Sequence, residues 1–162
     1  MTHGLNPEPP KLEVVPNDEL AALMQAVLAK GGRFRFQATG SSMRPFIREG
    51  DVLTVEPLAG PARLGEVVVC VQADGGRLMV HRVVRVGRTG WLTKGDQARQ
   101  ADGWVAQPVL VGRVVRVERQ GQAAWAGLGR ERVLIGWLSR WGWLVPMVGW
   151  AAALMKKIRR FS

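Results

Sequence analysis

The sequence predicts a mainly β fold: a β-sheet assembly with an amphipathic helix before it and a hydrophobic helical segment after it. Three observations predict it. Apolar residues alternate with polar ones or form short runs between residues 33 and 117, Gly-rich turns separate these runs, and no helical period interrupts them. Many short strands without intervening helices are typical of all-β sheet or barrel-like folds. The strands are expected at residues 33–37, 51–56, 67–71, 78–86, 91–93 and 108–117.

The first helix is expected to begin at Asn17, which can cap its first turn, and acidic residues follow there at the positive helix end. The Gly-Gly pair at residues 31–32 predicts its end. At about 13 residues it is too short to span a bilayer and is expected to dock on the sheet. Its apolar face is predicted to consist of Leu20, Leu23, Val27 and Leu28.

The two ends of the chain differ from this body. Residues 1–16 contain four prolines and no apolar period, which predicts a flexible lead without the features of a secretory signal.

The net charge of +10 suggests a polyanionic partner, either nucleic acid or an anionic lipid surface. Residues 120–162 carry +6 of that charge and five of the seven tryptophans. This pattern favours an anionic membrane surface as partner, and no nucleic acid is expected.

Residues 133–155 form the most apolar stretch, and a basic cluster follows at residues 156–160. As a helix the stretch would be about 34 Å long, enough to cross a hydrocarbon core of roughly 30 Å. Against a span stand Arg140, Gly136, Gly142 and Pro146. The alternatives are a helix or helical hairpin lying in the membrane interface, with its tryptophans at the headgroups, and a buried terminal helix. We expect membrane contact of some kind.

Three segments carry residues suited to catalysis: Ser42 in a Gly-rich loop, His81 in an expected strand, and Asp96 and Asp102 after another strand. A serine hydroxyl becomes a nucleophile when a base accepts its proton, and imidazole with a carboxylate on its other nitrogen is suited to this. Each residue alone would more often be structural, as a loop serine, a core histidine or a turn aspartate. The ordered set favours catalysis. No G-x-S-x-G elbow is present, which argues against an α/β-hydrolase.

Cysteine and histidine counts limit the other chemistries. The one cysteine, Cys70, excludes an intramolecular disulfide and a cysteine-rich zinc site. The two histidines do not favour a histidine-based metal cage. We expect neither a metal nor a cofactor.

Taken in order, S-M-x-P with a following G-D, then H-R-V-V, then K-G-D with a further aspartate resemble the motifs of type I signal peptidases. The similarity is to the serine–histidine subtype of the endoplasmic reticulum, archaea and some bacteria, and it covers residues 38–117. The resemblance implies a signal-peptidase-like β-sheet assembly. It also implies a serine endopeptidase that cleaves leader or signal peptides after small residues, from a protein or peptide precursor bound along a strand edge.

The resemblance assigns roles by position. Ser42 takes the place of the nucleophile, and His81 takes the place that a general-base lysine has in the bacterial dyad subtype. Asp102 is expected to orient His81, with Asp96 as the rival for that role. The sequence does not separate the two.

The oxyanion is expected to be held by the backbone N–H of Ser42 and a neighbouring donor, with Ser41 and Met43 as the adjoining candidates. Gly40 lacks a hydroxyl that some relatives carry, so a side-chain donor would have to be Ser41. Ala98 stands where relatives commonly have asparagine. This departure alters the acidic loop but removes neither carboxylate.

The expected organisation is a lead at 1–16, an endopeptidase domain at 17–119 and a membrane-associating tail at 120–162. We expect a location at a bacterial or archaeal cell membrane, on a side that the sequence leaves open. Two alternatives remain: a cytoplasmic maturation protease that trims the N-terminal extension of a dedicated partner, and a non-catalytic basic binding module. The related self-cleaving repressor proteases rank lower, because they pair serine with lysine and carry a DNA-binding module for which this chain has no room.

Overall fold

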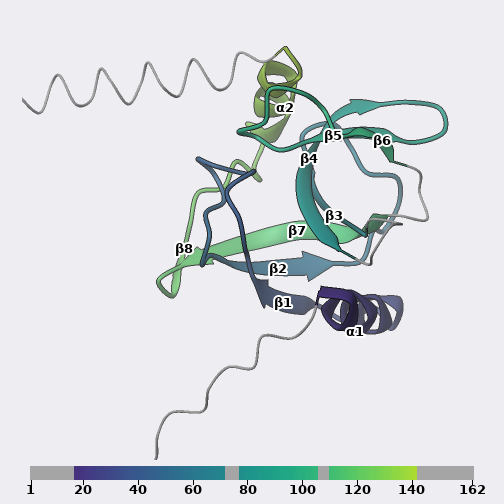
Figure 1. Cartoon of the computed structure of the whole chain (residues 1–162), viewed down its shortest axis with the longest axis vertical. Coiled ribbons are helices and arrows are strands. Elements are labelled where there is room, and N and C mark those ends of the chain that lie inside the picture. Colours follow the sequence, from purple (N-terminus) through teal and green to yellow (C-terminus); the bar gives the residue numbers. More distant parts are fainter. Residues whose placement is uncertain (1–16, 72–76, 106–109, 142–162) are drawn as a thin grey trace, which may run out of the picture.

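The computed structural model describes residues 17–71, 77–105 and 110–141 (Figure 1). In these ranges a mainly antiparallel sheet lies between two helices, which confirms the predicted fold class at that level. The elements are α1 (Asn17–Ala29), β1 (Phe34–Gln37), β2 (Val52–Glu56), β3 (Val67–Val71), β4 (Leu78–Val86), β5 (Trp91–Lys94), β6 (Gly103–Val105), β7 (Leu110–Arg119), β8 (Gln122–Ala123) and α2 (Arg132–Arg140).

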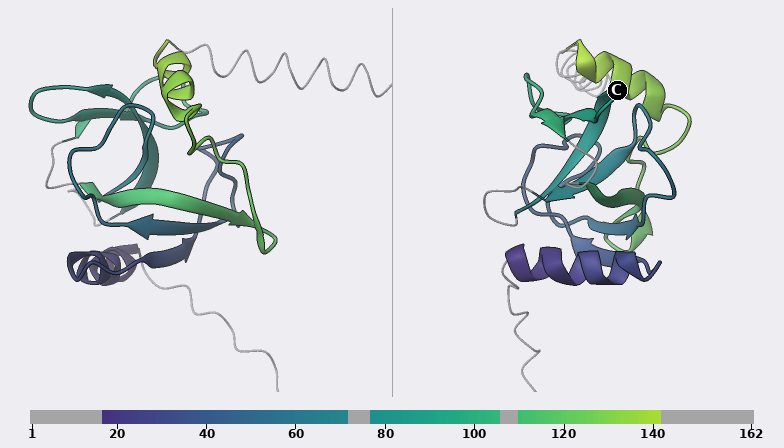
Figure 2. Two further views of the ribbon diagram at one scale, coloured as in Figure 1. Left: turned by 180° about the vertical axis from the view of Figure 1, so that it is seen from behind. Right: turned by 90° about the vertical axis from the view of Figure 1, so that its right-hand side faces the viewer.

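The sheet has the strand order β1-β2-β7-β3-β4-β5-β6, and β8 pairs with β7. Every pairing in it is antiparallel. The views in Figure 2 place α1 beside the β1–β2 end and α2 at the opposite end of the molecule. The β4–β5 half of the sheet, near α2, carries His81 and leads into Asp96 and Asp102, whereas Ser42 lies in the loop between β1 and β2.

Helix α1 has the expected bounds, and the chain turns at Gly31 with a φ of 76°. Its buried stripe differs from the prediction. Ala21, Met24 and Leu28 are buried, whereas Leu23 is 54% exposed. Residues three or four apart share a helix face, and the 21–24–28 spacing fits the sheet better than a stripe through Leu23 does.

All six expected strands are present, with ends that differ by at most two residues in the described ranges. Strands β6 and β8 were not predicted, because three and two residues are too short to show a period of two. The continuous apolar run of β3 has a clear cause. Val67 and Val69 lie in one core cluster while Val68 and Cys70 lie in another, so both faces of this strand are covered.

Only part of the expected tail falls within the described residues. Helix α2 accounts for residues 132–140 of the hydrophobic segment; residues 142–162, like the lead at 1–16, lie outside the described ranges. None of the helices in the described part of the chain has the length and apolar character needed to cross a membrane. Two residues of the expected tail pack on the body: Ala126 is buried in the main core, and Ile135 is buried against Phe46. The domain bounds themselves stay a prediction.

Candidate active site

Ser42 lies in the loop that joins β1 to β2. Two backbone hydrogen bonds close the base of this loop, Ala38 N–H to Asp51 O (2.8 Å) and Gly50 N–H to Ala38 O (2.9 Å). Met43, with the buried apolar residues that follow it, fixes the inner side of the loop in the core, while Ser42 stays exposed. The loop thus presents one hydroxyl on an anchored turn.

An ion pair fastens the far end of this loop to β7. Arg119 donates to both oxygens of the Asp51 carboxylate at 2.8 and 2.7 Å and to the carbonyl oxygen of Phe46 at 3.2 Å. Burial by itself raises the pKa of Asp51, but the hydrogen bonds from Arg119 and from the Arg48 N–H, with the arginine charges, outweigh burial and hold that pKa below its usual value. Asp51 therefore stays ionised as a structural clamp.

His81 lies in β4 opposite Val68 of β3. Its Nε2 atom is 3.1 Å from the Ser42 Oγ, and its Nδ1 atom is 2.5 Å from the Asp102 Oδ2. A carboxylate only accepts hydrogen bonds, so Nδ1 carries the proton and Nε2 is left to accept the serine proton. The three residues therefore form a continuous Ser–His–Asp chain with the polarity that a general base needs.

Asp102 is itself held from β5. Its backbone N–H donates to the Thr93 carbonyl (3.0 Å), and the Thr93 hydroxyl donates to its Oδ2 (3.2 Å). Thr93 is fully buried, whereas the Asp102 side chain is 22% exposed. Sequence reasoning missed Thr93; its place in the motif before K-G-D was the available signal.

Gly95 allows the serine loop and the histidine to meet. A Cβ atom there would lie 2.8 Å from the Ser42 carbonyl oxygen and 3.2 Å from the His81 Nε2. The Ser42 carbonyl also accepts the Gln97 N–H at 2.8 Å. Only glycine permits so close an approach of backbone to both groups, so Gly95 was a second residue that the sequence analysis did not assign.

Asp96 is in a different place from Asp102. Both of its oxygens accept hydrogen bonds from Arg82, at 2.8 Å each, and neither side chain of this pair is exposed. Arg82 also donates to the carbonyl oxygens of Gly65 and Gly127 at 2.9 Å. The structure brings Asp102 to His81 and leaves Asp96 in a buried ion pair.

Ser41 and Met43, the two residues expected to adjoin the oxyanion, differ in exposure. Ser41 is exposed beside Ser42, and its carbonyl accepts the Arg44 N–H. The Met43 side chain is buried in the main core cluster. A contribution of Met43 to an oxyanion hole would therefore come from its backbone N–H.

Two further ionisable groups nearby are poorly suited to nucleophilic or base catalysis. Burial, and then the charge of Asp102, raise the pKa of Cys70 to about 12, so its thiol stays neutral. Burial lowers the pKa of Lys94, but its Nζ donates to the Ser139 carbonyl oxygen at 2.5 Å and is thereby engaged away from Ser42. No group of three potential metal ligands occurs among the residues of ranges 17–71, 77–105 and 110–141.

Residues 8–101 match the protein family described as Peptidase S24-like. The chain belongs to the Peptidase S24-like family. Membership indicates a serine peptidase, and it confirms the predicted class of enzyme at that level. The matched range of this S24-like peptidase includes Ser42, His81 and Asp96 and ends one residue before Asp102. No curated protein matches the chain.

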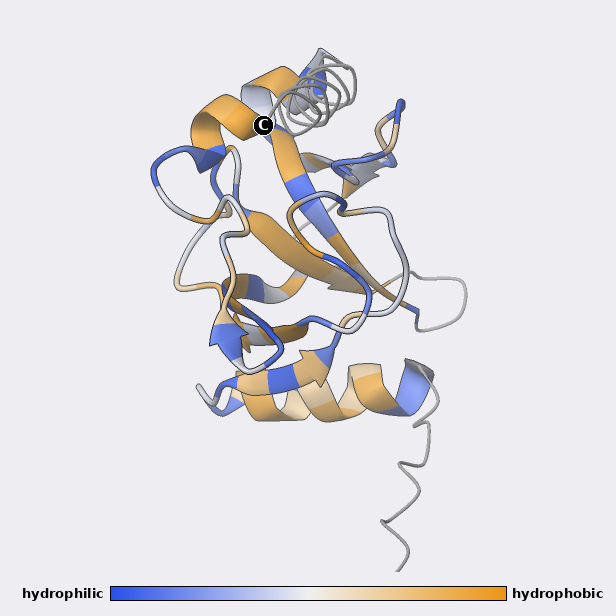
Figure 3. Ribbon diagram, turned by 90° about the vertical axis from the view of Figure 1, so that its left-hand side faces the viewer, coloured by the Kyte–Doolittle hydropathy of each residue, from blue (hydrophilic) through white to orange (hydrophobic). Residues whose placement is uncertain are grey.

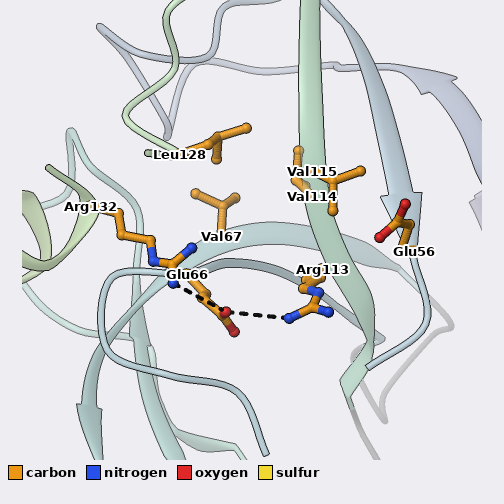
Figure 4. Close-up of a pocket in the computed structure, with 8 residues that line it drawn as sticks. All are labelled: Glu56, Glu66, Val67, Arg113, Val114, Val115, Leu128 and Arg132. Atoms are coloured by element: carbon orange, nitrogen blue, oxygen red, sulfur yellow. Dashed lines mark hydrogen bonds and ion pairs between the residues drawn. The ribbon is translucent and has the colours of Figure 1, made fainter. Parts of the chain in front are cut away.

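A separate pocket of the S24-like peptidase contains none of these residues (Figure 4). It is a cavity of about 200 Å³ beside the start of α2. Glu66 lies between Arg113 and Arg132, at 3.5 and 3.9 Å. The Glu66 carboxylate thus links Arg132 of α2 to Arg113 of the sheet. Because these charges neutralise one another, the pocket is poorly suited to a charged ligand.

Proposed function

We propose that this chain is a serine endopeptidase of the signal-peptidase type, with Ser42 as nucleophile, His81 as general base and Asp102 as the residue that orients His81. Its substrate is a protein or peptide precursor, from which it removes a leader or signal peptide after a small residue. The single observation that carries the proposal is the 3.1 Å contact between Ser42 Oγ and His81 Nε2, with Asp102 on the opposite nitrogen.

The proposed reaction has two halves. His81 Nε2 takes the proton of Ser42 as Oγ attacks the scissile carbonyl carbon, and backbone N–H groups at Ser42 and Met43 stabilise the oxyanion. The C–N bond then breaks as His81 gives that proton to the leaving amine. Water attacks the acyl-serine with His81 again as base, which releases the acid product and restores the serine hydroxyl.

The position of Lys94 favours this mechanism over the serine–lysine pairing of self-cleaving relatives. Lys94, the lysine next to the acidic loop, has its Nζ on the Ser139 carbonyl and not on Ser42. His81 occupies the hydrogen-bonding position of the base. Signal-peptide specificity is supported by the sequence motifs around Ser42, His81 and Asp102, which resemble those of signal peptidases.

The test is cleavage of quenched fluorescent peptides by the purified full chain. The panel holds signal-peptide junctions with a small residue before the cleaved bond, and the same peptides with a bulky residue there. We expect cleavage of the first set only, and a loss of at least about 10³-fold in kcat/KM for Ser42→Ala and for His81→Ala. Thr89→Ala, which removes a hydroxyl from an exposed turn, should cleave like wild type.

Undiminished cleavage by Ser42→Ala would overturn the proposed mechanism. Cleavage of peptides with bulky residues as well as small ones would overturn the signal-peptidase specificity and leave the mechanism standing. Cleavage confined to the N-terminal extension of one partner protein would replace it with the maturation-protease alternative.

A further inference from the structure

Helix α2 has an apolar face that the described protein does not cover. Its members, which we call the α2 face, are Val133 (49% exposed), Leu134 (59%), Trp137 (50%) and Trp141 (59%), the last at the helix C-cap. The two indole rings lie edge to face with centroids 6.4 Å apart. Figure 3 shows α2 as a largely apolar helix on the outside of the molecule, remote from α1. An exposed apolar cluster with two tryptophans is typical of an interaction surface.

The opposite side of α2 is packed and fixed. Ile135, Gly136 and Ser139 are buried, and a Cβ atom at Gly136 would lie 2.9 Å from the Gly65 Cα. The Lys94 Nζ holds the Ser139 carbonyl in the last turn of the helix. The α2 face therefore does not turn inward without loss of these contacts.

A basic hollow of about 260 Å³ adjoins the α2 face. Its lining combines Leu64 of the loop between β2 and β3 and apolar residues of β4 with Arg85, Arg140 and Trp137. The Arg140 guanidinium lies over the Trp141 ring at 5.6 Å. Within the described ranges, neither Arg85 nor Arg140 forms an ion pair with a carboxylate. Two positive charges thus border the apolar surface.

We propose that the α2 face docks on an anionic phospholipid surface, with its tryptophans at the headgroup boundary and lipid phosphates at Arg85 and Arg140. Tryptophan beside arginine is suited to this boundary, because one group is apolar with a polar edge and the other pairs with phosphate. The sequence beyond α2 adds four basic residues between positions 156 and 160, which complement the same surface. An acidic peptide would fit the arginines but not the four apolar side chains.

Docking places the active site at the lipid surface. Lys94 donates to the Ser139 carbonyl oxygen of α2, and the next residue, Gly95, lies against Ser42 and His81. Ile135 of α2 packs on Phe46, which is four residues beyond Ser42. The substrates would then be precursors presented at the membrane. This last consequence rests on the proposed function, whereas docking itself does not.

The experiment measures binding of the full chain to vesicles by co-sedimentation. One set of vesicles is phosphatidylcholine alone, and the other contains roughly 30% phosphatidylglycerol, which makes it anionic. The test variant is Leu134→Ala/Trp137→Ala. Its matched control is Leu23→Ala/Trp125→Ala, which removes one leucine and one tryptophan of 54% and 67% exposure from other surfaces. A third variant, Arg85→Gln/Arg140→Gln, removes charge alone.

We expect the wild type to bind anionic vesicles about tenfold more tightly than neutral ones. The test variant should lose about tenfold in affinity and the matched control less than twofold. The charge variant should bind anionic vesicles less tightly and neutral vesicles like wild type. Ser42→Ala should bind like wild type, and the test variant should cleave soluble peptides like wild type. These two results separate a failure of docking from a failure of the proposed function.

Two results would overturn the proposal. Equal vesicle binding by the test variant and its matched control would assign any binding to other parts of the chain. Absence of vesicle binding, together with a dimer in analytical ultracentrifugation that the test variant loses, would make a second copy of the chain the occupant of the α2 face.

Discussion

Neighbouring residues of β4 each pair with an aspartate, in two settings that differ in exposure and in what else the β4 side chain contacts. His81 meets Asp102 at a partly exposed site, where the ring also contacts the Ser42 hydroxyl. Arg82 meets Asp96 with no exposure of either side chain, and backbone carbonyls take up its remaining donors. Successive side chains of a strand point to opposite faces. His81 therefore lies at the Ser42–Asp102 site, while the next residue, Arg82, lies in a buried ion pair on the other face.

The difference shows how to tell a catalytic carboxylate from a structural one in this protein. Asp96 has both oxygens engaged by one guanidinium and has no path to solvent. Asp102 contacts the Nδ1 atom of His81 through one carboxylate oxygen, and the Nε2 atom of His81 faces Ser42. A carboxylate that orients a base must leave the other side of that base free for the substrate.

Of the two carboxylates, Asp102 is expected to have the larger effect on turnover, and Asp102→Asn tests it. An amide at that position can donate to Nδ1, which favours the tautomer whose Nε2 cannot accept the Ser42 proton. We expect kcat to fall by about 10³–10⁴-fold in peptide cleavage assays. The thermal unfolding midpoint should change little, because the Asp102 side chain is partly exposed. Unchanged turnover would place the orienting carboxylate elsewhere.

The largest expected effect on stability comes from Asp96→Asn. This change leaves the Arg82 guanidinium buried without a counter-charge, and the loss of one partner of a buried pair costs about 3–5 kcal/mol of unfolding free energy. Urea denaturation measures it. Glu56→Gln, in an ion pair whose arginine side chain is 73% exposed, is the matched control and should cost less than about 1 kcal/mol. Equal losses for the two variants would contradict a structural role for Asp96.

A smaller, pH-dependent effect is expected for Asp51→Asn. The pKa of Asp51 is below its usual value in the folded protein, so its contribution to stability is present above the unfolded pKa and is lost as the pH falls through the folded pKa. At pH 7 the variant should be about 1.5–3 kcal/mol less stable, the range for a hydrogen bond to a charged group. The gap between variant and wild type should narrow as denaturation is repeated below pH 4, near the unfolded pKa of about 3.9. A gap independent of pH would contradict the clamp.

The smallest expected effect is that of Thr93→Val, which replaces the hydroxyl that donates to Asp102 by a methyl group of similar size. Loss of one hydrogen bond to a charged carboxylate, worth about 1.5 kcal/mol, should lower kcat about tenfold and leave KM unchanged. Thr93→Ser should restore kcat, because it keeps the hydroxyl. If Thr93→Ser is as slow as Thr93→Val, the side chain acts through packing and not through Asp102.

Much of the site could be predicted from the sequence because its motifs are local. Ser42, His81 and Asp102 each stand in a short recognisable segment, and the geometry joins these three. The choice between Asp96 and Asp102 could not be made from sequence. Both lie in the connection between β5 and β6, and which of them faces His81 depends on how the chain returns from Gly95 to β6.

The parts of the fold that escaped prediction are those governed by distant contacts. Leu23 has the right spacing for the buried side of α1, but the sheet surface selects Ala21 and Met24 instead. Strand β8 consists of two exposed residues that pair only because β7 is beside them. The packing of α2 on the sheet depends on two glycines, Gly65 and Gly136, that lie far apart in sequence and come within contact distance. No local sequence pattern predicts that two such distant residues come into contact.

The most direct test of the central claim is covalent labelling of the folded chain with a fluorophosphonate, in which a serine Oγ displaces fluoride from phosphorus. Peptide mapping by mass spectrometry should place the adduct on Ser42. His81→Ala should slow labelling by at least about 100-fold, because the hydroxyl then has no base to accept its proton. Heat-unfolded protein serves as the control for non-specific reaction. An adduct on another residue, or labelling of Ser42 at an unchanged rate in His81→Ala, would contradict the Ser42–His81–Asp102 mechanism.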